Sequence, residues 1–109
     1  MTNRKENALK IVRELHHELS KVYGERLKGV YLYGSYARDE ATDDSDIDVA
    51  IVLSGTLSRA DESDRVNGML SEICLRENTL VSALFLSEEE WVKRPFAIHR
   101  SISREGIAA

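Results

Sequence analysis

Residues 34 to 53 read GSYARDEATDDSDIDVAIVL, and this stretch decides how the chain folds. It begins with the pair Gly34-Ser35, and ten residues separate Ser35 from Asp46. Asp46 and Asp48 then stand at the start of a continuously apolar run. Glycine lets a backbone approach a phosphate closely, and side chains two positions apart on a strand share one face. The stretch therefore predicts a turn that can hold phosphates, followed by a strand that carries two neighbouring carboxylates.

The pattern on either side of this stretch predicts further helices and strands. Apolar residues recur at helical spacing in two segments, which predicts helices over residues 3–23 and 58–77. Short apolar and aromatic runs predict strands over residues 27–33, 46–53 and 79–86. The order helix, strand, strand, helix, strand, helix predicts an α/β (α+β) fold, with a small mixed sheet of at least three strands and helices packed on one face.

The end of the chain predicts two more helical segments. Ser87 and Glu90 have the spacing of a capping box, so a short helix is expected to begin there and to end near Pro95. Residues 96–109 are expected to form a last helical segment. The side chains expected to pack inward from it are Ile98 and Ile102.

Length and composition restrict the class of protein. A chain of 109 residues predicts a single domain, residues 1–109. The net charge of -4 argues against a nucleic-acid-binding surface, which needs a basic face. No apolar run is long enough to span a bilayer, and the polar first residues do not form a signal peptide. The single cysteine, Cys74, excludes an intrachain disulfide. These features favour a cytoplasmic protein without a membrane partner.

The two aspartates predict a site for a divalent metal. Neighbouring carboxylates resist joint ionisation unless a cation lies between them, and Mg²⁺ is typically bound by one or two carboxylates together with substrate phosphates. A calcium loop that includes Asp44 is not supported, because Val49 and Gly55 occupy the positions where an EF-hand needs glycine and glutamate. The alternative is that Asp46 and Asp48 are solvated residues at the edge of a strand.

The turn at Gly34 and Ser35 predicts the phosphate-binding half of the same site. The Ser35 hydroxyl and the N–H groups that follow it can face an anion if a helical turn begins there. Arg38, three residues on, lies on the same side of such a turn and adds positive charge. The chain has neither a P-loop nor a Rossmann glycine pattern. The alternative is a plain turn with a capping serine.

In this order and spacing, Gly34-Ser35 and Asp46-x-Asp48 resemble the signature of the polymerase-β-like nucleotidyltransferase superfamily. The likeness extends over nearly the whole chain and is greatest to the minimal nucleotidyltransferases of bacteria and archaea. Further matching residues are Ala37 and Arg38 after the pair, Ser45 before the first aspartate, and the tail Arg104-Glu105-Gly106-Ile107.

The resemblance implies an enzyme that binds a nucleoside triphosphate, such as ATP, with Mg²⁺ and transfers the nucleoside monophosphate, here AMP, to a hydroxyl. It implies that Gly34 and Ser35 contact the triphosphate, and that Asp46 and Asp48 are the catalytic metal ligands. Small members are encoded as antitoxins beside HEPN-domain ribonuclease toxins, and some transfer AMP to a tyrosine of the toxin. The implied partner is therefore a HEPN-domain toxin. Self-association is left open.

The sequence departs from the superfamily pattern at one position. A third carboxylate is expected on the strand after the second helix, but residues 79–86 contain no acid, and Ser82 is the polar residue inside that strand. Loss of a general base costs about 10²–10⁴-fold in rate. Three interpretations follow. The enzyme is slow, or a group of the substrate, of the partner or of Glu88 or Glu89 stands in for the missing acid. The third is that the protein is a binding module that neutralises the toxin by masking it. Modification of a small antibiotic is less favoured, because the chain has no added domain to hold one.

Overall fold

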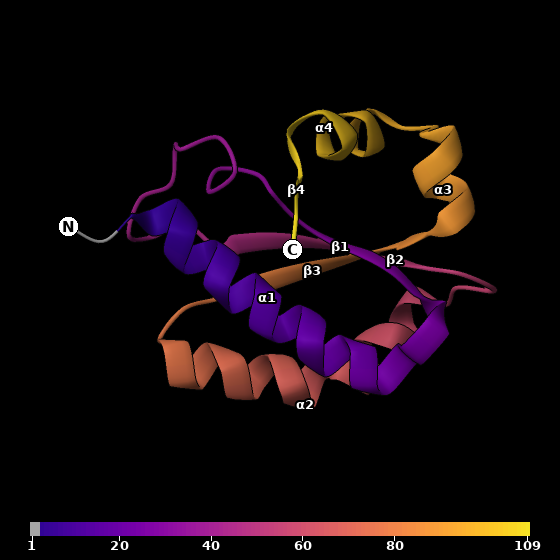
Figure 1. Ribbon diagram of the computed structural model, residues 1–109, viewed down its shortest axis with the longest axis horizontal. Helices are drawn as coiled ribbons and strands as arrows, with labels where there is room; N and C mark the ends of the chain where they lie inside the picture. Colours follow the sequence, from indigo (N-terminus) through magenta and orange to yellow (C-terminus); the bar gives the residue numbers. More distant parts are fainter. Residues whose placement is uncertain (1–2) are drawn as a thin grey trace.

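The structure is a computed structural model that describes residues 3–109 (Figure 1). The chain forms four helices, a short 3₁₀ turn and four strands within these residues. In order they are α1 (Arg4–Tyr23), η1 (Gly24–Arg26), β1 (Leu27–Tyr33), β2 (Ile47–Leu53), α2 (Arg59–Glu77), β3 (Val81–Ser87), α3 (Glu88–Lys93), α4 (Ala97–Glu105) and β4 (Ile107–Ala108). The predicted order of the first six elements is confirmed, with boundaries shifted by one or two residues.

The sheet is mixed, as predicted, and its strand order is β3-β2-β1-β4. β1 pairs antiparallel with β2 and with β4. β2 and β3 are parallel, since α2 carries the chain back to the starting edge between them. The amino ends of β2 and β3 therefore lie at the same edge of the sheet.

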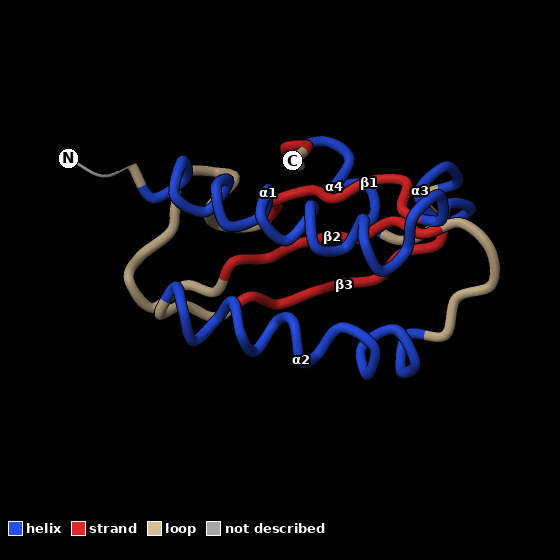
Figure 2. Tube along the Cα trace, turned by 60° about the horizontal axis from the view of Figure 1, so that its bottom comes forward, coloured by secondary structure: helices blue, strands red, loops and turns tan. Residues whose placement is uncertain are grey.

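The two faces of the sheet have different covers. The long helices α1 and α2 run along the strands and pack on one face, as predicted (Figure 2). The β2 side chains on this first face are Ile47, Val49, Ile51 and Leu53, all at most 2% exposed. Burying a side chain of this kind contributes about 1.5–3 kcal/mol. The second face carries Ala50 and Val52, which pack with Ile102 of α4 and Trp91 of α3. The short helices thus cover part of a face that the prediction left bare.

Local capping explains where several helices begin and end. The Asn3 side chain accepts the N–H groups of Lys5 and Glu6 and begins α1. Ser87 and Glu90 form the predicted capping box of α3. Ser58 precedes α2 without a side-chain hydrogen bond, so α2 lacks the kind of side-chain cap that begins α1 and α3. None of the helices within residues 3–109 is long and apolar enough to cross a bilayer.

The tail differs from the prediction in two ways. The helix α4 ends at Glu105, and Gly106 turns the chain into an extended conformation so that β4 pairs with β1. The predicted helix over the last residues is therefore wrong, because pairing with the open edge of β1 satisfies their backbone groups instead. Ile102 is buried as predicted, but Ile98 is 45% exposed, because it lies on the outer side of α4.

Candidate active site

The Gly-Ser turn follows directly from the end of β1. Gly34 has φ +77°, a conformation that favours glycine. Its carbonyl accepts the N–H groups of Ala37 and Arg38, each at 3.1 Å, which closes one helical turn. The N–H groups of Ser35 and Tyr36, at the start of this turn, have no hydrogen-bond acceptor among residues 3–109. The turn therefore offers two open donors next to the Ser35 hydroxyl.

The turn is pressed against the second carboxylate of the motif. A Cβ added to Gly34 would lie 2.3 Å from Oδ2 of Asp48, closer than two such atoms can approach. A side chain at residue 34 would therefore displace the carboxylate. The backbone of the preceding residue in β2 is fixed as well, because Ile47 N–H donates to the Leu80 carbonyl at 2.8 Å. The two halves of the predicted motif thus form one site, and glycine is required where they meet.

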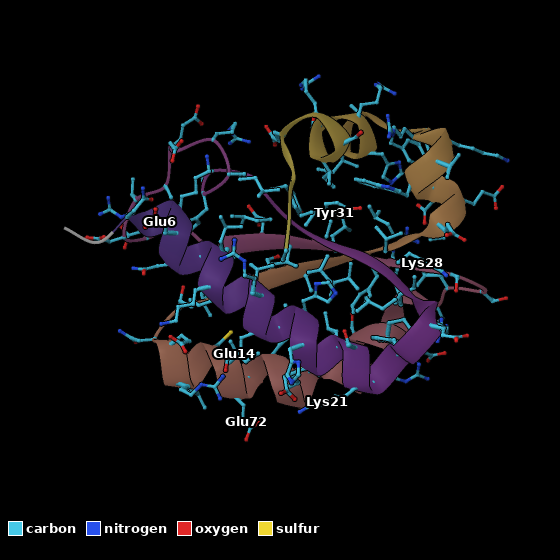
Figure 3. The ribbon with its side chains drawn as sticks, in the orientation of Figure 1. Glu6, Glu14, Lys21, Lys28, Tyr31 and Glu72 are labelled. Atoms are coloured by element: carbon cyan, nitrogen blue, oxygen red, sulfur yellow. The ribbon has the colours of Figure 1, made fainter. Side chains whose placement is uncertain are left out.

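Sheet register determines the neighbours of Asp48. Asp48 is paired with Tyr33 of β1 and with Ser82 of β3. The next pairs along the same face, Ala50 with Tyr31 and Leu84, belong to the second-face cluster. Figure 3 shows Tyr31 on the side of β1 that faces α3 and α4. Asp48 therefore belongs to the second face, where it lies half-buried between a tyrosine and an exposed serine.

The electrostatic environment of Asp48 favours a cation. Burial raises the pKa of the Asp48 carboxyl, the nearby charge of Asp46 raises it further, and the Arg38 guanidinium partly offsets both. Burial and the Asp48 charge also raise the pKa of the Tyr33 phenol. A cation held between Asp46 and Asp48 would relieve the repulsion between the two carboxylates.

The donor set is compatible with Mg²⁺ that arrives with a nucleotide. No group of three or more His, Cys, Asp or Glu side chains within residues 3–109 is arranged to hold a metal ion. Asp46 is exposed and Asp48 half-buried, so both carboxylates remain open to solvent. Two carboxylates with an open side suit Mg²⁺, which keeps water or phosphate oxygens as its other ligands. Asp46 and Asp48 are the residues that would hold it.

Arg38 lies in this site but is bound to two acids. Its Nε donates to Glu40 at 3.0 Å, and its Nη1 donates to Glu105 at 3.0 Å. A guanidinium has five N–H groups, so three remain available to a phosphate. Glu105 has no place in the motif, and neither Glu105 nor Tyr33 was predicted to take part in the site. The sequence feature that could have drawn attention to Glu105 is the tail Arg104-Glu105-Gly106-Ile107, which resembles that of the minimal nucleotidyltransferases.

Ser82 occupies the sheet position beside Asp48 where a third acid would lie. Glu88 and Glu89, proposed above as stand-ins, follow the opposite end of β3, since Ser87 pairs with Leu53. Ser82 and Ser87 are five positions apart along the strand, about 17 Å at ~3.3 Å per residue. Glu89 is also paired with Lys93. Neither glutamate reaches the site, so the suggestion that Glu88 or Glu89 stands in for the third acid is wrong.

Two hollows lie beside the motif loop rather than on the second face. One, of about 470 Å³, is bounded by Asp44, Asp46 and the exposed Leu75 and Leu80. The other, of about 400 Å³, lies against α1 and includes Tyr36. The Tyr36 ring packs against the first-face core, and its hydroxyl donates to the Ser45 carbonyl at 3.4 Å. Tyr36 thus faces away from Asp48.

Comparison with known proteins agrees with this geometry. The family described as polymerase beta, nucleotidyltransferase matches residues 14–94, which include the turn, both aspartates and Ser82. The chain belongs to this family. The nucleotidyltransferase fold predicted from the motif is therefore confirmed.

Individual relatives agree with the family. A protein of Methanocaldococcus jannaschii with the provisional name protein adenylyltransferase is 33% identical over 101 residues, which cover 92% of this nucleotidyltransferase and 95% of the relative. A crystal structure from Sulfolobus solfataricus, provisionally named a nucleotidyltransferase, superposes with a TM-score of 0.63 at 26% identity, over 96% of this chain and 81% of the other. A toxin–antitoxin structure with AMP-PNP shares the fold, with a TM-score of 0.57 at 18% identity over 95% of this chain and 70% of the other.

Proposed function

We propose that this nucleotidyltransferase uses ATP and Mg²⁺ to transfer AMP to a hydroxyl of a partner protein, a HEPN-domain toxin that it neutralises as an antitoxin. The family and the relative named a protein adenylyltransferase support AMP transfer to protein. The toxin partner is supported by the resemblance to the minimal nucleotidyltransferases and by the shared fold with the toxin–antitoxin structure.

One observation carries the proposal: the Gly34 backbone closes directly onto the Asp48 carboxylate. A phosphate bound at the open N–H groups of the turn would lie next to the two carboxylates. The positive charge of Arg38 would then lie on one side of the phosphate, and the solvent-exposed Asp46 on the other. This geometry brings together the two requirements of phosphoryl transfer, which are positioning of the phosphates and neutralisation of their charge.

Each residue has a separable task in the transfer. Ser35 and the turn amides bind and orient the triphosphate, and Arg38 adds charge to the same group. Asp46 and Asp48 would hold Mg²⁺, and Mg²⁺ bound there would supply charge neutralisation to the phosphates. The acceptor oxygen forms a bond to the α-phosphorus as the bond to the departing pyrophosphate breaks. Tyr33 and Ser82 flank Asp48 and provide no carboxylate, so neither of them supplies a third acid to take the acceptor proton.

The test uses ATP labelled on its α-phosphate, Mg²⁺ and a HEPN-domain toxin as the partner protein. We expect label on the partner with the wild type and none with Asp46→Asn or Asp48→Asn. Asp44→Asn is the matched control, because Asp44 is an exposed aspartate of the same loop outside the strand. Equal labelling by all four proteins would contradict the assignment of the two aspartates.

A second candidate function is a binding module that masks the toxin. The observation that favours it is Ser82, which leaves the site without the third acid. This function predicts that the Asp46→Asn and Asp48→Asn variants still neutralise the toxin in cells and that no label is transferred by the wild type. Loss of neutralisation in both variants, with binding to the toxin intact, would exclude masking.

A further inference from the structure

The contact between Arg38 and Glu105 joins two parts of the chain that lie 67 positions apart. The Arg38 Nη1 donates to Glu105 Oε1 at 3.0 Å. The Glu105 side chain is only 20% exposed, so solvent screens this ion pair less than the others around the turn. The same guanidinium also pairs with Glu40, whose side chain is 64% exposed and only two residues away. Glu105 is more buried than Glu40 and more distant in the chain, so it is the better candidate for fixing the position of Arg38.

The position of Glu105 is itself fixed by the fold. It is the last residue of α4, and the N–H of Gly106 donates to the Ile102 carbonyl at 2.7 Å. Ile102 is fully buried against the second face of the sheet. On the other side of Glu105, Ile107 pairs with Leu32 of β1. Figure 1 shows α4 leading into β4, which returns beside β1. Glu105 is thus held at both ends.

The neighbouring glycine admits no side chain. A Cβ on Gly106 would lie 2.4 Å from the Ile102 carbonyl oxygen. The turn after Glu105 is therefore tight, and its backbone cannot move away without losing the contact to α4. A glutamate fixed in this way can set the direction of a flexible arginine.

Arg38 needs such a constraint because it is a long side chain on an exposed turn. It loses rotamer freedom when it binds a phosphate, and a partner that already orders it reduces that cost. The turn that carries Arg38 lies beside the carboxylate pair, because the Arg38 N–H donates to the Gly34 carbonyl at 3.1 Å and the Gly34 backbone lies against the Asp48 carboxylate. Glu40 and Glu105 each accept one N–H of the guanidinium, and three N–H groups remain for a ligand.

We propose that Glu105 is a positioning residue for the nucleotide site: it orients Arg38 toward the triphosphate and so makes the C-terminal segment α4–β4 part of that site. This inference rests on the proposed nucleotide-binding function. Its consequence is that the affinity for a nucleoside triphosphate depends on a residue that touches neither the phosphates nor the metal ligands.

The test measures binding of AMP-PNP with Mg²⁺ to the full chain by calorimetry, without the partner. We expect Glu105→Gln to weaken binding by about threefold to tenfold, the size expected of a partly exposed ion pair. Glu40→Gln is the matched control, since it removes the exposed partner of the same guanidinium, and we expect less than a twofold change. Thermal unfolding is recorded for each variant.

A double-variant cycle separates positioning from a purely structural role. If Glu105 acts through Arg38, the Arg38→Gln/Glu105→Gln protein binds AMP-PNP no more weakly than Arg38→Gln alone. Independent, additive losses would overturn the inference. If Glu105→Gln fails to fold, Glu105→Ala takes its place in the same cycle with Arg38→Gln, and independent losses there would overturn the inference as well.

The outcomes also distinguish this inference from the proposed function. Absence of AMP-PNP binding by the wild type contradicts the nucleotide-binding function, and the inference falls with it. Equal binding by the wild type and Glu105→Gln contradicts the role of Glu105 alone and leaves the proposed function standing.

Discussion

At the scale of single residues, Asp48 is held where its charge opposes folding. Burial and Asp46 raise the pKa of its carboxyl. The folded chain therefore favours the protonated Asp48 carboxyl. The resulting stabilisation is fully present below about pH 4, the ordinary pKa of an aspartate, and is lost as the pH rises through the raised pKa of Asp48 in the folded chain. We predict that Asp48→Asn has a higher Tm than the wild type at pH 7. The difference should shrink to nothing at about pH 3, as measured by thermal unfolding across pH.

The Asp48→Asn variant also tests whether the Asp48 charge is needed to bind Mg²⁺ and nucleotide. Added Mg²⁺ and AMP-PNP should raise the Tm of the wild type but leave that of Asp48→Asn unchanged, because binding to the folded state alone stabilises it. Asp44→Asn, an exposed control, should behave as the wild type in both experiments. A lower Tm for Asp48→Asn at pH 7 would contradict the assigned sign.

Gly34 is predicted to be irreplaceable for two separable reasons. Gly34→Ala places a Cβ against the Asp48 carboxylate and also strains a positive φ. Gly55→Ala is the matched control, because Gly55 has φ +82° but open space around its Cβ position. We expect about 1 kcal/mol of destabilisation from Gly55→Ala and about 2–3 kcal/mol from Gly34→Ala in urea unfolding. Only Gly34→Ala should lose AMP transfer, and equal effects of the two variants would show that no clash occurs.

Ser82→Asp tests the missing acid directly. It would place a carboxylate beside Asp48 on the same face of the sheet. We predict faster AMP transfer, by up to about 10²-fold if a general base limits the wild type. Without Mg²⁺ the variant should be less stable, because a third negative charge adds repulsion. Ser71→Asp, on an exposed position of α2, is the charge control and should change neither quantity. Transfer no faster than wild type would indicate that proton removal is not limiting.

At the scale of elements, two serines precede helices but differ in their bonds. The Ser87 hydroxyl accepts the Glu90 N–H at 3.0 Å, and the Glu90 carboxylate accepts the Ser87 N–H at 3.1 Å. Ser58 precedes α2 without such a bond. We predict that Ser87→Ala costs about 1 kcal/mol in urea unfolding and that Ser58→Ala costs less than half of that. Similar costs at the two positions would contradict this difference in capping.

At the scale of the whole molecule, the parallel pairing of β2 and β3 separates two groups of acids. Asp48 lies at the amino ends of these strands, whereas Glu88 and Glu89 follow the carboxyl end of β3. We predict that the Glu88→Gln/Glu89→Gln variant transfers AMP at the rate of the wild type, within twofold, in the labelled-ATP assay. A loss of tenfold or more would require these glutamates to reach the site by a rearrangement of the sheet.

The two long helices form a further long-range feature of the molecule. Arg76 of α2 pairs with Glu14 of α1, and Figure 3 shows Glu14 on the side of α1 that faces α2. Deeper between these helices, the buried Glu62 accepts the Tyr23 hydroxyl at 2.9 Å and pairs with Arg65. Burial and this bond raise the pKa of Tyr23 to about 12. These contacts hold α1 and α2 together over the first face of the sheet, whereas the candidate active site lies on the second face.

The sequence alone determined the motif and most of the local structure. Gly34-Ser35 and Asp46-x-Asp48 predicted the family, and the Ser87 capping box predicted the start of α3, because turns, caps and amphipathic spacing depend on residues close in the chain. The helix predicted over residues 96–109 is confirmed for Ala97–Glu105 but is wrong for the last residues, because strand pairing with β1 overrode the local helical pattern there.

Only the tertiary structure decided what surrounds Asp48. The pairing with Ser82 follows from the register of two parallel strands, which depends on how Val49 and Ile51 pack against the first-face core. The approach of Glu105 to Arg38 follows from the return of β4 to β1. Both contacts join residues far apart in the chain, and their formation depends on long-range burial and strand pairing that local sequence patterns do not encode.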